Sequence, residues 1–123
     1  MKYLILIKSN PEWAGAFASF TPEQQAEGMA IYEKLFSDLQ EAGELVDAEQ
    51  LAAPETARVV TTSDAGTVSS DGPFVEAKVW FGGYYIVDVD SIDRAVEIAG
   101  RLPEATNGMV SVHPILANAG MEY

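Results

Sequence analysis

The chain has 123 residues, of which 48% are apolar and 21% charged, and these values are typical of one globular domain. Its net charge of −12 repels phosphate backbones and anionic lipid surfaces, so we expect no nucleic-acid and no membrane partner. The absence of cysteine excludes disulfides, thiolate nucleophiles and cysteine-ligated zinc, and the single histidine excludes a multi-histidine metal site within one chain. We therefore expect a single domain over residues 1–123 with no metal and no other cofactor. Because no apolar run is long enough for a membrane span or a signal peptide, we also expect a cytoplasmic protein.

The first half of the chain predicts a strand followed by a long helix. Lys2–Lys8 is nearly continuous in apolar residues and predicts a strand that is covered on both faces. Ser9–Phe20 shows no clear period, so we expect a loop with at most a helical turn. Thr21-Pro22-Glu23-Gln24 is typical of a capping box and predicts a helix over Pro22–Ala42. Its apolar stripe consists of Met29, Tyr32, Leu35, Phe36 and Leu39.

The middle of the chain predicts strands and tight turns. Glu44–Leu51, Ala57–Ser63 and Thr67–Ser70 are expected to be strands, and the last two form a hairpin. Val79–Val89 predicts a long strand, in which Gly82-Gly83 marks a bulge or a close backbone approach.

A second helix and a last strand follow. Asp90 or Ser91 is suited to cap the helix, and Met109–Leu116 predicts the strand. The apolar stripe of this helix consists of Ile92, Ala95, Val96, Ala99 and Leu102.

The order of these elements predicts an α+β fold, the ferredoxin-like plait, with an extra central hairpin. Both helices of that plait cover one face of an antiparallel sheet. The strands are nevertheless apolar on both faces, as Leu4 and Leu6 alternate with Ile5 and Ile7. Apolar patches of that size are uncommon on monomers, so we expect a homodimer in which two sheets pack face to face.

The segment Asp71-Gly72-Pro73-Phe74-Val75-Glu76-Ala77-Lys78 resembles the signature of the YCII-related family, in its DGPF-domain branch. Gly82-Gly83-Tyr84 is similar to the family's strand entry, and both chain ends are similar as well. The resemblance implies a ferredoxin-like fold and a dimeric α+β barrel, without an established function. Proteins of the DGPF type are often encoded beside alternative sigma factors, which implies a regulatory setting.

The sequence departs from the family pattern at three places. Val79 stands where a glutamate is usual, and His113 stands where an arginine is common. The histidine that a proposed catalytic histidine–aspartate pair takes from the first helix is missing, because Pro22–Ala42 contains none. That pair therefore does not transfer to this chain in its usual form.

His113 and Asp71 are the candidate catalytic residues. A histidine can exchange a proton near neutral pH, and His113 is expected on the sheet face opposite the helices, together with Ser111. Asp71 beside Gly72 and Pro73 is suited to be a partly desolvated base. The structural alternatives are a hydrogen-bonded interfacial histidine and an ordinary turn aspartate.

Several further residues are candidates for ligand binding. Glu76 and Lys78 share one face of an extended segment, where they can orient a ligand or simply form a surface ion pair. Aromatic residues are candidates to line an apolar pocket between the sheet and a loop, or to be plain core and interface packing. These residues are Trp13, Phe17, Tyr32, Trp80, Phe81, Tyr84 and Tyr85.

Two functions follow from these features. The first is a small cofactor-independent enzyme that uses acid and base chemistry on a small organic molecule, in a pocket associated with the dimer. The second is a non-catalytic module that binds a small molecule or has a regulatory role associated with transcription-factor signalling. The polar face around His113 favours the enzyme, whereas the missing helix histidine favours the regulatory module.

Overall fold

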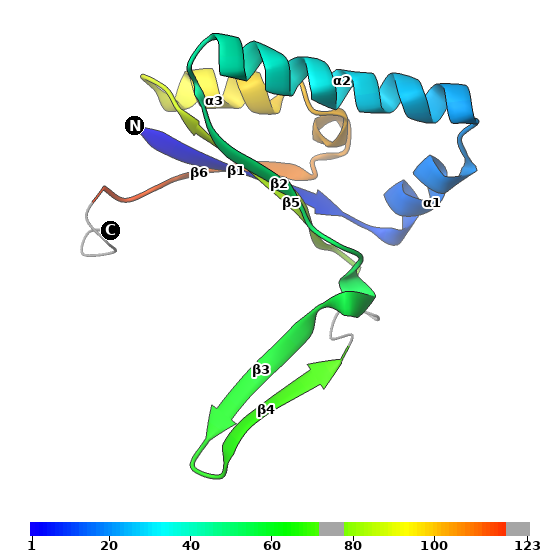
Figure 1. The fold of residues 1–123 in the computed structure, drawn as a ribbon, viewed down its shortest axis with the longest axis vertical. Helices are drawn as coiled ribbons and strands as arrows, with labels where there is room; N and C mark the ends of the chain where they lie inside the picture. Colours follow the sequence, from blue (N-terminus) through cyan, green and yellow to red (C-terminus); the bar gives the residue numbers. More distant parts are fainter. Residues whose placement is uncertain (72–77, 118–123) are drawn as a thin grey trace.

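A computed structural model of the chain describes residues 1–71 and 78–117. Four antiparallel strands form a sheet in the order β2-β5-β1-β6, and helices lie over one of its faces (Figure 1). This order confirms the predicted ferredoxin-like α+β fold. The strands are β1 (Lys2–Ser9), β2 (Leu45–Gln50), β5 (Trp80–Asp88) and β6 (Val110–Pro114), and the covering helices are α2 (Pro22–Glu41) and α3 (Ile92–Ala99).

Side chains of β1 alternate between the two faces of the sheet. Tyr3, Ile5 and Ile7 are buried beneath the helices, whereas Leu4 and Leu6 point to the opposite face and are only partly buried. The same alternation in β5 places Tyr85 and Val87 under the helices. The hydrophobic core therefore lies between the sheet and the helical layer, and the other face of the sheet is left without helices.

The start of α2 has the capping box that its sequence predicts. The Thr21 hydroxyl accepts a hydrogen bond from the Gln24 backbone N–H at 3.2 Å, and the Thr21 N–H donates to the Gln24 side chain at 2.9 Å. Leu35 and Leu39 are fully buried against the sheet. Met29 and Phe36, which the pattern also assigns to the core side, are exposed.

The predicted loop over Ser9–Phe20 is wrong, because Pro11–Ser19 forms the helix α1. The Asn10 side chain accepts a hydrogen bond from the Trp13 backbone N–H at 2.7 Å, and Pro11 occupies the first turn, where a missing N–H is harmless. No residue of α1 is buried. The apolar period is weak for that reason, so the helix was detectable only from its capping residues.

The apolar stripe predicted for the second helix is partly wrong. The buried residues of α3 are Ala95, Ile98 and Ala99, whereas Ile92 and Val96 are 44% and 53% exposed. Because Ile98 lies at the buried face of the helix, Ile92 and Val96 lie at the edge of that face. Ser91 caps this helix by accepting a hydrogen bond from the Arg94 N–H.

The extra hairpin forms a two-stranded sheet of its own from β3 (Arg58–Ser63) and β4 (Gly66–Asp71). It follows the short 3₁₀ helix η1 (Pro54–Thr56) and extends away from the body of the molecule (Figure 1). Every side chain of β3 is exposed. Residues 72–77, which make up most of the DGPF-like motif, lie outside the described residues.

The Gly82-Gly83 pair combines both features that the sequence suggests. The pairing of β1 and β5 shifts between Ile7 and Lys8, so Gly82 is skipped in the ladder as in a bulge. A Cβ atom on Gly83 would lie 2.7 Å from the carbonyl oxygen of Glu49. Only glycine therefore allows β2 to approach β5 at this point.

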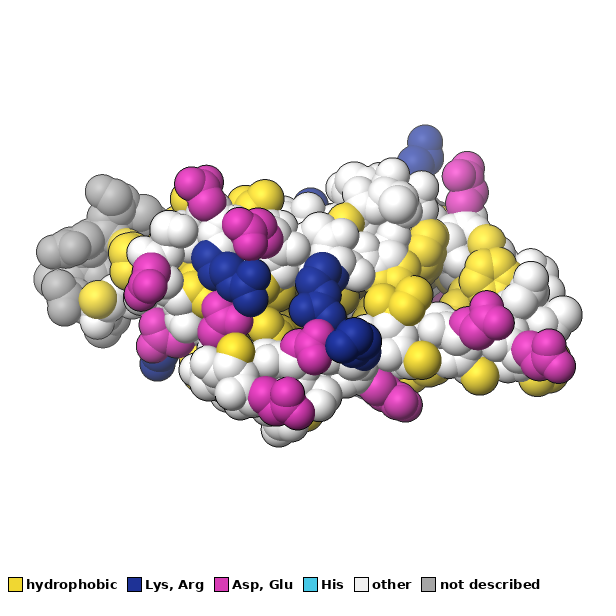
Figure 2. Space-filling view, turned by 90° about the horizontal axis from the view of Figure 1, so that it is seen from above, with side chains coloured by type: hydrophobic (Ala, Val, Ile, Leu, Met, Phe, Trp, Pro, Cys, Tyr) yellow, Lys and Arg dark blue, Asp and Glu magenta, His cyan; other side chains and the backbone are white. Residues whose placement is uncertain are grey.

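The outer surface of the helical layer carries ion pairs. Figure 2, which looks onto this layer from above, shows blue basic side chains close to magenta acidic ones. Arg94 donates to both carboxylate oxygens of Glu44 at 2.8 Å, and Arg101 donates to Asp38 at 2.6 Å. Within residues 1–71 and 78–117, no helix has both the length and the apolar character that a membrane span requires.

A candidate ligand-binding pocket

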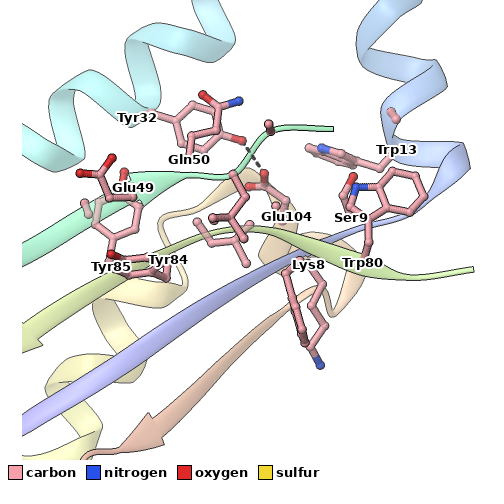
Figure 3. Close-up of a pocket in the computed structure, with 18 of the residues that line it drawn as sticks. Lys8, Ser9, Trp13, Tyr32, Glu49, Gln50, Trp80, Tyr84, Tyr85 and Glu104 are labelled. Atoms are coloured by element: carbon pink, nitrogen blue, oxygen red, sulfur yellow. Dashed lines mark hydrogen bonds between the residues drawn. The ribbon is translucent and has the colours of Figure 1, made fainter. Parts of the chain in front are cut away.

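A cavity of about 750 Å³ lies between α1, α2 and the neighbouring ends of β1, β2 and β5 (Figure 3). This volume is within the range of pockets that hold small organic molecules. All of the aromatic residues that the sequence proposes for a pocket line it, namely Trp13, Phe17, Tyr32, Trp80, Phe81, Tyr84 and Tyr85. The loop expected to form one wall is the helix α1.

The outer wall of the pocket is held by few contacts. Trp13 and Phe17 project from α1, and the Gln25 side-chain amide of α2 donates a hydrogen bond to the Phe17 carbonyl at 3.2 Å. Phe17 also packs its ring against Phe20, with 5.9 Å between the ring centres. Because α1 buries no residue, we expect this wall to change its position more readily than the sheet beneath it.

The polar centre of the pocket is Glu104, which is only 8% exposed. It lies in the short helix η2 (Pro103–Asn107), between α3 and β6. The Tyr32 hydroxyl donates a hydrogen bond to its Oε2 atom at 2.7 Å, drawn as the dashed line in Figure 3. Its Oε1 atom is buried and has no hydrogen-bond partner among the described residues. Buried carboxylate oxygens are rarely left in this state, which marks Glu104 as the functional candidate.

Glu104 contributes to raised pKa values of two tyrosines in the pocket. Burial, the hydrogen bond to Glu104 and the charge of that carboxylate all raise the pKa of the Tyr32 hydroxyl well above its usual value. Burial and the same charge raise the pKa of Tyr85. Both hydroxyls therefore stay protonated at neutral pH, and Tyr32 acts as a donor that holds Glu104 in position.

The other charged side chains at the pocket do not neutralise Glu104. Glu33 and Glu49 add negative charge at its border, and Lys8 is the basic side chain among the described residues that line it. Figure 3 shows Lys8 extending away from Glu104. The salt bridges found within residues 1–71 and 78–117 do not include Glu104.

The two predicted catalytic residues lie elsewhere. His113 is exposed in β6, on the sheet face opposite the helices as predicted, and its Nε2 atom lies 2.8 Å from the Ser111 hydroxyl. Asp71 ends β4, in the separate two-stranded sheet, and its side chain lies outside the described residues. Because the Asp71 side chain is not described, a contact between the two residues is untested and their joint role stays a prediction.

The predicted ligand-binding residues divide among three places. Tyr32 and Tyr85 line the pocket, and Ser111 is beside His113 on the open face. Lys78 is exposed just before β5, and Glu76 lies outside the described residues. Of the predicted ligand-binding residues that the structure describes, the two tyrosines meet in one cavity.

Sequence reasoning missed Glu104. It lies between Leu102, which is buried, and the last strand, in a segment that reads as a polar turn. No local sequence pattern sets it apart from the other residues of this short 3₁₀ turn. The partner Tyr32 is 72 residues away in the chain, so the pair is visible only in three dimensions.

Comparison with known proteins places the chain in a family. It is 26% identical over 117 residues to an uncharacterized protein of Rhizobium meliloti (strain 1021), which covers 94% of this chain and 92% of the relative. The family model described as the YCII-related domain matches residues 1–118. With nearly the whole chain matched, the protein belongs to the YCII-related domain family.

Proposed function

We propose that this protein binds a small organic molecule with an apolar body in the aromatic pocket, and that Glu104 accepts a hydrogen bond or a proton from it. The observation that carries this proposal is the buried Oε1 atom of Glu104, a residue of the pocket lining, which has no hydrogen-bond partner among the described residues. A bound donor would remove the cost of that unpaired oxygen. The aromatic walls would supply the apolar contact area.

Acid and base chemistry without a cofactor is the favoured activity. A carboxylate in a largely apolar pocket is suited to take a proton from a carbon next to a carbonyl group and return it to the product. Isomerisation of an activated carbonyl compound uses both proton removal and proton return, elimination by a lyase uses the removal, and decarboxylation uses a protonated Glu104 to deliver a proton after CO₂ leaves. A positioned base contributes about 10²–10⁴-fold to the rate, and Glu104 takes the role for which the sequence had suggested Asp71 and His113.

A non-catalytic regulatory module, associated with transcription-factor signalling, is the second candidate. The observation that favours it is the β3–β4 hairpin, which extends from the body and exposes Val60 and Val68. A projecting hairpin with exposed valines is suited to contact another protein. Ligand binding in the pocket would then change that contact instead of leading to turnover.

We also propose that a second copy of the chain covers the open face of the sheet. Leu4 lies opposite Ile86 and Leu6 lies opposite Tyr84 on this face, so four partly buried side chains form one apolar patch. His113 and Ser111 border the patch on β6, and Asp47 and Glu49 border it on β2. An apolar centre with polar borders is typical of protein interfaces.

A thermal-shift screen of small metabolites tests the proposed function, with the native protein, Glu104→Gln and His113→Ala compared. A ligand at 100 times its dissociation constant should stabilise the folded state by about 2.7 kcal/mol. We expect this stabilisation to be lost in Glu104→Gln and kept in His113→Ala. Turnover that is lost in Glu104→Gln selects the enzyme, whereas saturable binding without turnover selects the module. Ligands that need His113 but not Glu104 would refute the assignment of the site.

A further inference from the structure

We infer that the ligand of this pocket is an organic cation, a protonated amine or amidinium group on an apolar body, whose N–H donates to Glu104 Oε1. This inference rests on the proposed function and names the chemical class of the ligand. Three observations carry it: the charge balance of the pocket, the aromatic walls and the one free oxygen of Glu104.

The charge balance excludes an anion and disfavours a neutral ligand. Glu33, Glu49 and Glu104 line the pocket, and Lys8 extends away from Glu104 (Figure 3). An anionic ligand would meet like charges inside a site from which water is partly removed. A neutral ligand would leave the buried carboxylate without a countercharge, which is the costly arrangement for an ion in an apolar setting.

The walls of the pocket suit a cation as well as an apolar body. Trp13, Tyr32, Trp80 and Tyr85 come from three different elements and surround the Glu104 region (Figure 3). The face of an aromatic ring carries partial negative charge and attracts ammonium and guanidinium groups, most strongly in tryptophan. Aromatic rings around a carboxylate therefore favour a positive group near the acid and apolar parts farther away.

The geometry of Glu104 also limits which cations fit. Tyr32 already donates to Oε2, so Oε1 is the acceptor atom that has no partner among the described residues. A primary or secondary amine, or an amidinium, can donate an N–H to Oε1 and form a charge-assisted hydrogen bond. A quaternary ammonium has no N–H and would satisfy the charge without satisfying the oxygen, so we expect it to bind more weakly.

Intrinsic fluorescence provides the measurement, because both tryptophans of the chain line the pocket. The probes are cyclohexylmethylamine, cyclohexylmethanol and cyclohexanecarboxylate, which share a ring and do not absorb at the excitation wavelength. We expect the amine to bind about tenfold more tightly than the alcohol, the size of one charge-assisted hydrogen bond, and the carboxylate not to bind. The trimethylammonium form of the amine should bind more weakly than the amine itself.

Glu104→Gln keeps the size of the side chain and its acceptor for Tyr32 while removing the charge. The preference for the amine should fall to about twofold or less in this variant, since Tyr32 engages the amide oxygen and the NH₂ group in place of Oε1 cannot accept from the ligand. Glu97→Gln removes an equal charge from an exposed position on α3 and should keep the tenfold preference. The comparison of probes on the native protein does not depend on any variant folding.

The outcomes separate the two proposals. If the alcohol binds as tightly as the amine, the cationic ligand is refuted, whereas a pocket for small molecules remains supported. If the amine preference survives in Glu104→Gln, the cation is recognised by another group and the inference fails. If no probe changes the tryptophan emission of the native protein at millimolar concentration, both proposals fail together.

Discussion

At the scale of single residues, the buried Glu104–Tyr32 pair is one that we expect to be less stabilising than an apolar pair of the same size. A buried carboxylate gives up its hydration, and one hydrogen bond from Tyr32 replaces only part of what water supplied. Residues of this kind are often found at functional sites, where the side chain is selected for ligand binding and not for stability. The pair therefore predicts a measurable conflict between stability and ligand binding.

Removing the Tyr32 hydroxyl should expose this conflict. Tyr32→Phe leaves both oxygens of Glu104 without a partner, so the free energy of unfolding should fall by about 1–3 kcal/mol. The double variant Tyr32→Phe with Glu104→Leu removes both polar groups and should recover to within about 1 kcal/mol of the native protein. Urea denaturation of the native protein and both variants gives these values. A double variant less stable than Tyr32→Phe alone would show that Glu104 stabilises the fold.

Sequence reasoning identified the walls of the site but not its centre. Aromatic residues such as Trp13 and Trp80 attract attention because they are large and few, and the fold brings them together as proposed. Glu104 is one of 19 acidic residues, and the others that the structure describes are less buried. What distinguishes it is the burial produced by α2 and β5, which no local sequence pattern encodes.

At the scale of elements, the junction of β2 and β5 depends on one glycine. Gly83 faces the backbone of Glu49 so closely that a Cβ atom would overlap its carbonyl oxygen, at 2.7 Å. At Gly82 the nearest atoms to a Cβ are 3.7 and 3.8 Å away, which is ordinary contact. The two neighbours therefore form a matched pair for substitution.

Gly83→Ala should lower the free energy of unfolding by about 1–3 kcal/mol, because one strand must move to relieve the overlap. Gly82→Ala should stay within about 1 kcal/mol of the native protein, since alanine also restricts the unfolded chain. Chemical denaturation measures both effects. Equal losses in the two variants would mean that the close approach of β2 is not the cause.

A bidentate ion pair fastens α3 to the start of β2. The Arg94 guanidinium donates to both oxygens of Glu44 and holds the pKa of that carboxyl below its usual value of 4.5. The folded state therefore binds a proton at Glu44 less readily than the unfolded state. The stabilisation is complete above pH 4.5 and is lost as the pH falls through the lower pKa of the folded state.

Glu44→Gln should accordingly reduce stability by about 1 kcal/mol or less at pH 7, with the difference from the native protein disappearing in strong acid. Denaturation curves at a series of pH values measure this convergence. Glu97→Gln, which removes the other and more exposed partner of Arg94, serves as the control and should change stability by less than about 0.5 kcal/mol. A constant difference between Glu44→Gln and the native protein at every pH would contradict the ion-pair explanation.

Elements were predictable where local signals agree. Capping residues and an apolar period both mark α2, and nearly continuous apolar runs mark β1 and β5, so their positions were predicted closely. The helix α1 was missed because it buries no side chain and so has no apolar period to show. The inner side of α3 was misplaced because an eight-residue helix offers too few turns to locate the centre of a stripe.

At the scale of the whole molecule, the sheet is covered on one side only. Helices cover Tyr3, Ile5 and Ile7, while Leu4 and Leu6 remain partly exposed on the opposite side. The continuous apolar runs that predict this two-sided apolar sheet are visible in the sequence. What covers the second side is not encoded in the fold of one chain, so the homodimer stays a prediction that requires its own measurement.

Sedimentation at micromolar concentration tests the homodimer directly. We expect the native protein to sediment at twice the chain mass of 13.2 kDa. Leu4→Lys places a charge in the centre of the open face, opposite Ile86, and should yield the monomer because an unpaired charge would be buried in the interface. Val96→Lys makes the same type of change on the exposed side of α3 and should leave the dimer intact. Unchanged tryptophan emission in both variants would show that the pocket is preserved. A native protein that sediments as a monomer would leave the open face to another partner and refute the dimer.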